Sequence, residues 1–104
     1  MKCEILINNE SIGTVDFQVI DLTMGAISGI LICNENYYKY QSQIRKQTSE
    51  TGISNLSNFN YKIITENKIE ILAQGGIGII DSEKFNELTA ECAGVNLSLF
   101  ETQN

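Results

Sequence analysis

The sequence contains no histidine, no tryptophan and no proline. Histidine is the most frequent general base near neutral pH and the most frequent metal ligand in proteins. Its absence excludes Ser-His and Cys-His catalytic mechanisms within this chain. Without proline, the sequence also lacks one usual marker of linkers between domains.

Long apolar runs and basic residues are also scarce. No stretch approaches the ~20 apolar residues that span a bilayer, and the N-terminal residues hold no apolar run of signal-peptide length. The net charge is −6, which opposes binding to nucleic-acid phosphates and to anionic membranes. We therefore expect a cytoplasmic protein that binds neither nucleic acid directly nor membranes.

The three cysteines, Cys3, Cys33 and Cys92, are an odd set among apolar neighbours. They show neither the paired spacing of a zinc site nor the even count of a disulfide framework. Buried, reduced thiols are the expectation, with no metal site and no cofactor. Cys33 directly precedes a predicted helix and is the best placed of the three for a reactive thiol, which would require a lowered pKa.

The length and composition predict one domain, residues 1–104. A chain of 104 residues is near the most common domain size, and its 42% hydrophobic and 19% charged residues are typical of a globular protein. A chain this long buries roughly two-thirds of its unfolded surface on folding. A single hydrophobic core is expected to suffice without disulfides.

Alternating apolar and polar residues predict several antiparallel strands. Residues 2–7 and the stretch from Ile12 to Val19 alternate on either side of a polar turn, which is the pattern of a β-hairpin. The run Ile30–Cys33 is suited to a central strand. Further strands are expected at residues 59–65, 68–73, 77–80 and 87–92.

One helix is predicted over about residues 35–47. Asn34 can cap it, and Tyr37, Tyr40 and Ile44 follow at spacings of three and four on one face. The Ser-, Thr- and Asn-rich stretch 48–58 is expected to be a loop. The predicted fold class is α+β, a mainly antiparallel sheet of about five to six strands built from hairpins, with this helix packed on one face.

The glycine-rich stretch Gly75–Gly78 is interpreted as a turn or bulge. Glycine lets backbone amides approach an anion, but the Lys-Ser/Thr pair of a phosphate-binding loop is missing. Tyr37 and Tyr40 are expected to pack on the sheet, with Tyr38 partly exposed.

The acidic residues are concentrated in the last forty residues. Residues 66–104 hold seven acids against Lys68 and Lys84, a net charge of −5, whereas the first 65 residues are nearly neutral. In the stretch 87–92, Glu87 and Glu91 fall on the polar side of the alternation. Asp81 is interpreted as a turn residue or a helix cap. The candidate partner-binding residues are the acids Glu70, Asp81, Glu83, Glu87 and Glu91.

The local acidity predicts a non-enzymatic domain that binds a basic protein. Electrostatic complementarity speeds encounter and rejects wrong partners, which suits an inhibitor such as an immunity protein or an antitoxin that neutralises a nuclease toxin. One alternative is a small-ligand domain or carboxylate-dependent enzyme, in which Asp16, Asp21 or Asp81 transfers protons beside the glycine loops. Another is a subunit of a larger assembly. The sequence leaves the oligomeric state open.

Overall fold

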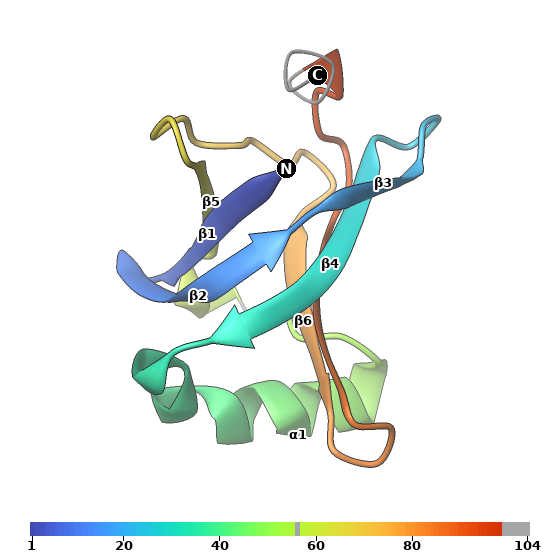
Figure 1. Cartoon of the computed structure of the whole chain (residues 1–104). Coiled ribbons are helices and arrows are strands. Elements are labelled where there is room, and N and C mark those ends of the chain that lie inside the picture. Colours follow the sequence, from blue (N-terminus) through green and yellow to red (C-terminus); the bar gives the residue numbers. More distant parts are fainter. Residues whose placement is uncertain (56, 99–104) are drawn as a thin grey trace.

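The computed structural model describes residues 1–55 and 57–98 and has an α+β fold, as predicted. Seven antiparallel strands form one curled sheet in the order β5-β1-β2-β4-β7-β6, with β3 paired to β4 (Figure 1). The strands are β1 (Lys2–Ile7), β2 (Glu10–Asp16), β3 (Gln18–Asp21), β4 (Ala26–Cys33), β5 (Lys62–Thr65), β6 (Ile77–Ser82) and β7 (Glu87–Cys92).

The first predicted hairpin is confirmed. β1 pairs with β2 through a tight turn at Asn8 and Asn9. Both residues adopt positive φ, which a two-residue hairpin turn of this type requires and which asparagine tolerates. The second alternating stretch is divided at the buried Phe17, where β2 ends and β3 begins. β2 pairs with β1 and β4, whereas β3 pairs with β4 alone within the described residues.

The helical segment differs from the prediction at both ends. Asn34 caps as expected, since its Oδ1 accepts from the Asn36 backbone N–H at 2.9 Å, but it caps the 3₁₀-helix η1 (Glu35–Lys39). The α-helix α1 (Gln41–Thr51) follows and continues into the stretch predicted to be a loop. It ends at Gly52, whose left-handed conformation terminates the helix.

Two further predictions about local structure need correction. Residues 68–73 form no strand, and only an isolated bridge between Glu70 and Ile64 joins them to β5. A second 3₁₀-helix, η2 (Ser57–Phe59), lies in the stretch expected to be a loop and strand start. Strand pairing depends on the partner strand, so a local alternating pattern overestimates strand content here.

The core lies between the sheet and the helical segment. Its side chains come from every strand except β3, and Tyr37 and Ile44 are fully buried as the helix-face spacing indicated. α1 packs across β6 (Figure 1). Tyr38 is exposed, as expected. None of the described helices is long and apolar enough to cross a membrane.

Gly13 occupies a position in the sheet that admits no side chain. It has φ +149°, and an added Cβ would lie 2.3 Å from the carbonyl oxygen of Ile32 on the neighbouring strand. The β2–β4 pairing therefore requires glycine at this position, both for its conformation and for the close approach of the two backbones.

We predict that Gly13→Ala lowers the free energy of unfolding by about 3 kcal/mol, because backbone strain and a clash with a neighbouring strand act together. Chemical denaturation checks this value. Gly52→Ala is the control, since Gly52 also has positive φ but has nothing within 4 Å of its added Cβ. It is expected to cost only about 1 kcal/mol. Equal losses in the two variants would show that the clash contributes nothing.

Candidate functional site

The hairpin formed by β6 and β7 carries most of the candidate acids, but it separates them into two environments. Ile79 and Asp81 of β6 face the core, and Asp81 is only 4% exposed. Glu83 lies in the turn between the strands, and Glu87 lies at the start of β7; both are exposed. The interpretation of Asp81 as a turn residue or helix cap is therefore wrong, because it lies within β6.

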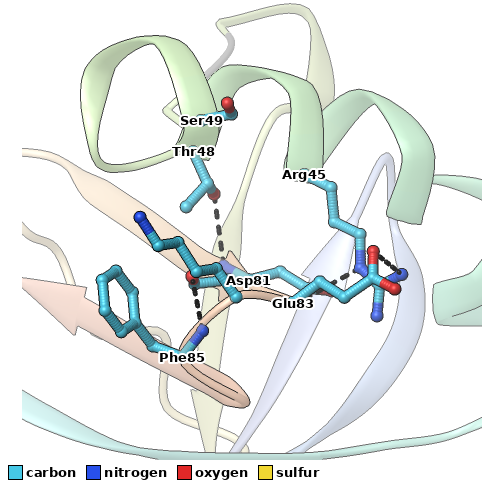
Figure 2. Close-up of a pocket in the computed structure, with 8 residues that line it drawn as sticks. Arg45, Thr48, Ser49, Asp81, Glu83 and Phe85 are labelled. Carbon is cyan, nitrogen blue, oxygen red and sulfur yellow. Dashed lines mark hydrogen bonds and ion pairs between the residues drawn. The ribbon is translucent and has the colours of Figure 1, made fainter.

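The helical segment supplies the partners of Asp81. The Tyr37 hydroxyl donates to Oδ2 at 2.5 Å, and Gln41 Nε2 donates to the same oxygen at 3.3 Å. Arg45 Nε donates to Oδ1 at 3.1 Å. The backbone N–H of Asp81 donates to Thr48 Oγ1 at 3.2 Å (Figure 2). The buried carboxylate is thereby surrounded by donors, as a buried charge requires.

The spacing of these partners explains why they meet one carboxylate. Residues 37, 41, 45 and 48 follow at intervals of four, four and three, which places them on one side of consecutive helical turns. Thr48 also explains why α1 extends beyond the predicted end. Its hydroxyl is used by the Asp81 N–H, so this contact between helix and sheet favours the helical conformation over a loop.

The electrostatics of the cluster keep its donors protonated. Burial, and then the adjacent Asp81, raise the pKa of the Tyr37 phenol far above its ordinary value. The hydrogen bond to Asp81 also raises the pKa of the Arg45 guanidinium. Tyr37 therefore remains a neutral donor and Arg45 a cation throughout the physiological range.

Arg45 joins the buried and exposed acids. Its Nη1 lies 3.5 Å from Glu83 Oε2, and the Glu83 side chain is 81% exposed. Exposed ion pairs contribute little to stability, so this contact mainly orients the two side chains. Its electrostatic consequence is that one cation of the helix is shared between Asp81 and Glu83.

The structure brings only some of the five candidate acids together. Glu87 and Glu91 lie on the same side of β7, because side chains two and four residues apart on a strand share a face. Glu83 lies in the adjoining turn. Asp81 belongs to the buried cluster, and Glu70 lies beside β5, at the other end of the strand order. The name β7 acidic strip is used below for Glu87 and Glu91.

Two pockets flank the Asp81 cluster. The larger, of about 690 Å³, lies between α1 and the β6–β7 turn and is lined by Ser49, Lys84 and the exposed Phe85, besides residues of the cluster (Figure 2). Lys84 Nζ lies 5.4 Å from the centroid of the Phe85 ring. The smaller, of about 200 Å³, lies between Tyr38 and Glu87. Asp81 borders both pockets with its carboxylate already engaged by Tyr37, Gln41 and Arg45.

The other candidate positions have structural roles or surface positions. Gly75 and Gly76 form the turn that enters β6, as predicted, since the Gly76 N–H donates to the Ala73 carbonyl at 3.0 Å. Asp16 is exposed at the end of β2, and Asp21 Oδ1 accepts from the Met24 backbone N–H. Among the described residues, no group of three His, Cys, Asp or Glu side chains is arranged to hold a metal ion.

Sequence reasoning missed Arg45, Gln41 and Thr48 as partners of Asp81. The available signal was their position on the same helix face as Tyr37. That spacing indicates a shared face without indicating which strand the face contacts. No protein-family model, curated protein or solved structure matches this chain.

All three cysteines are free thiols, and their environments differ. Cys3 and Cys92 are buried, which raises the pKa of Cys3 to about 11 and that of Cys92 to about 12. Cys33 is half-buried, with its Sγ 3.7 Å from the Tyr38 hydroxyl. Burial and a raised pKa both oppose reaction at Cys3 and Cys92, since the thiolate is the reactive form.

We predict that a thiol-reactive chromogenic disulfide at mildly alkaline pH modifies Cys33 rapidly and leaves Cys3 and Cys92 unmodified in the folded protein. All three thiols are expected to react after denaturation. Cys33→Ser serves as the control and is expected to abolish the rapid phase. A rapid phase that persists in this variant would contradict the assignment.

We predict that Tyr37→Phe lowers the free energy of unfolding by about 2 kcal/mol, because it removes one donor to a buried charged acceptor and keeps the ring. Tyr38→Phe is the control, since it removes an exposed hydroxyl from the adjacent residue, and the denaturation midpoint is expected to stay unchanged. Equal midpoints for both variants would mean that the Tyr37 hydroxyl does not contribute.

Proposed function

We propose that this domain is a binding protein without catalytic activity, and that it captures and inhibits a basic protein partner through the β7 acidic strip. An immunity protein or antitoxin that neutralises a nuclease toxin is the concrete form of this proposal. The position of Glu87 and Glu91 on the same side of β7 carries the argument.

One cation of the helix, Arg45, is engaged by other acids, which supports this role. Arg45 pairs with Asp81 and Glu83. The ion pairs found within residues 1–55 and 57–98 include neither Glu87 nor Glu91. Two carboxylates on one strand that have no ion-pair partner among the described residues produce a negative potential that a cationic partner surface complements.

The kinetic consequence suits an inhibitor. Opposite charges on two protein surfaces raise the association rate at low salt, whereas like charges exclude wrong partners. The chain as a whole carries a net charge of −6, so the long-range field has the same sign as the β7 acidic strip. An inhibitor that must bind a toxic enzyme before it acts benefits from this rate enhancement.

The environment of Asp81 argues against the carboxylate-dependent enzyme. A general base needs a free lone pair within reach of the substrate proton. The Asp81 carboxylate instead accepts hydrogen bonds from Tyr37, Gln41 and Arg45, and its side chain is buried. These contacts suit a structural role, in which the cluster holds the β6–β7 hairpin and the β7 acidic strip in place.

We predict that the double variant Glu87→Lys with Glu91→Lys associates more slowly with the partner and loses most of the salt dependence of association. The physical reason is that the local potential reverses sign. The partner is first recovered by affinity purification from the native host with the tagged full chain. Association rates are then measured with the purified partner across a salt series.

Glu66→Lys with Glu70→Lys is the matched control. It changes the net charge by the same amount, and its two acids are also four residues apart, but they lie in the segment beside β5. The proposal requires a much smaller effect from this control. Equal slowing in both double variants would show that only the overall charge acts, and the β7 acidic strip would have no special role.

A further inference from the structure

The central strand β4 departs from the alternation expected of a sheet with one face in solvent. Ile27 and Leu31 point into the core, as the alternation requires. Ile30 and Ile32 point to the opposite face, and each is 66% exposed. Polar residues normally occupy such outward positions. Threonine, which is β-branched and polar, would form the strand equally well there. The fold itself therefore gives no reason for isoleucine at positions 30 and 32.

The neighbours of these isoleucines extend the apolar area. Ile30 is paired in register with Thr89 of β7, which is paired in turn with Ile80 of β6. Thr89 Oγ1 is buried and has no hydrogen-bond partner among the described residues. On the other side of β4, Ile32 is paired with Thr14 of β2. The centre of this face is thus formed by isoleucine side chains and threonines.

Acids flank this centre on both sides. Glu4 of β1 is paired with Thr14, so it follows Thr14 and Ile32 along one row across the sheet. The β7 acidic strip shares the face of Thr89 on the other flank. Lys2 lies on the same flank as Glu4 and is paired in register with Asp16, whose carboxylate is in turn ion-paired with the N-terminal ammonium at 3.1 Å. An apolar centre with a charged rim is the usual composition of a specific protein interface.

We infer that the outer face of β2, β4 and β7 is the surface that docks the basic partner, with Ile30 and Ile32 as apolar anchors and with Glu4, Glu87 and Glu91 as the rim. The occupant is an apolar patch on the partner that is bordered by lysines or arginines. This inference rests on the proposed function and adds the docking face and the chemistry of the partner surface. Apolar anchors in the centre of an interface supply most of the affinity, whereas rim charges act mainly on the association rate.

The charge pattern favours this partner over a second copy of the chain. A two-fold contact between identical faces is isologous, so each flank of one copy meets a flank of the other. Both flanks carry acids, so a two-fold contact brings carboxylates of one copy near carboxylates of the other. The net charge of −6 on each chain adds further repulsion. A partner with a basic rim removes both obstacles.

The test uses the full chain and a helical peptide probe that has leucines on one face and lysines on both flanks. Titration of the ¹⁵N-labelled protein is expected to give saturable chemical-shift changes centred on Ile30, Ile32 and Thr89. Ile30→Thr with Ile32→Thr is expected to weaken peptide binding about tenfold or more. Two analogues of the probe, with glutamate for lysine and with serine for leucine, are expected not to bind.

Ile69→Thr with Leu72→Thr is the matched control, since these two side chains are also exposed but lie outside the docking face. Its affinity for the peptide is expected to equal that of the unchanged chain. Denaturation curves check that both double variants fold, and the single variants Ile30→Thr and Ile32→Thr replace the double variant if it does not.

Three results would overturn the inference. Undiminished peptide binding by Ile30→Thr with Ile32→Thr would exclude this face and leave the proposed function standing. Self-association of the unchanged chain that the same variant abolishes would make a second copy the occupant. The third result is peptide binding that depends on the isoleucines but is unchanged by Glu87→Lys with Glu91→Lys. It would show that the face does not select a basic partner, and the proposed function would then fail as well.

Discussion

The contact between the buried carboxylate of Asp81 and the helical segment determines how the two halves of this protein fit together. Removing a carboxylate from water costs several kcal/mol unless donors replace the lost hydration. Tyr37, Gln41 and Arg45 provide these donors from one side of η1 and α1, and Thr48 accepts the Asp81 N–H. The position of the helix and the position of β6 therefore cannot change independently.

This constraint extends from the core to the surface. β7 is paired with β6 along its whole length, so the position of Asp81 also fixes where Glu87 and Glu91 lie. Arg45 is held by Asp81 and Glu83 and leaves the β7 acidic strip without a cation from the helix. On the other edge of β7, β4 presents Ile30 and Ile32 beside the strip. The proposed binding face thus depends on the cluster around the buried Asp81 carboxylate.

Patterns within short stretches predicted much of the fold. The alternation in residues 2–7 and 87–92 identified two strands and their inward sides, since the side-chain period of a strand is two. The spacing of Tyr37 and Ile44 identified the buried side of the helical segment. The predictions failed where local preference competed with distant contacts. Thr48 is helical, and its hydroxyl accepts a hydrogen bond from the backbone N–H of Asp81 in the distant strand β6. In the described part of the chain, residues 68–73 form only isolated bridges, from Glu70 to Ile64 and from Ala73 to Val95.

The sequence by itself determined the α+β class, the inward and outward sides of β7 and the acidity of the last forty residues, because each depends on neighbouring residues or on composition. The tertiary structure alone decided which acids are neutralised and which are free. Asp81 and Arg45 are in contact although they are 36 positions apart in the sequence. Glu70 lies beside β5 and Glu87 lies in β7, and these two strands are not neighbours in the sheet. Likewise, the run Ile30–Cys33 looks uniformly apolar, and only the strand neighbours reveal that Ile30 and Ile32 face outward. Contacts between residues that are far apart in the sequence leave no periodic pattern in the local sequence, so they cannot be predicted from it.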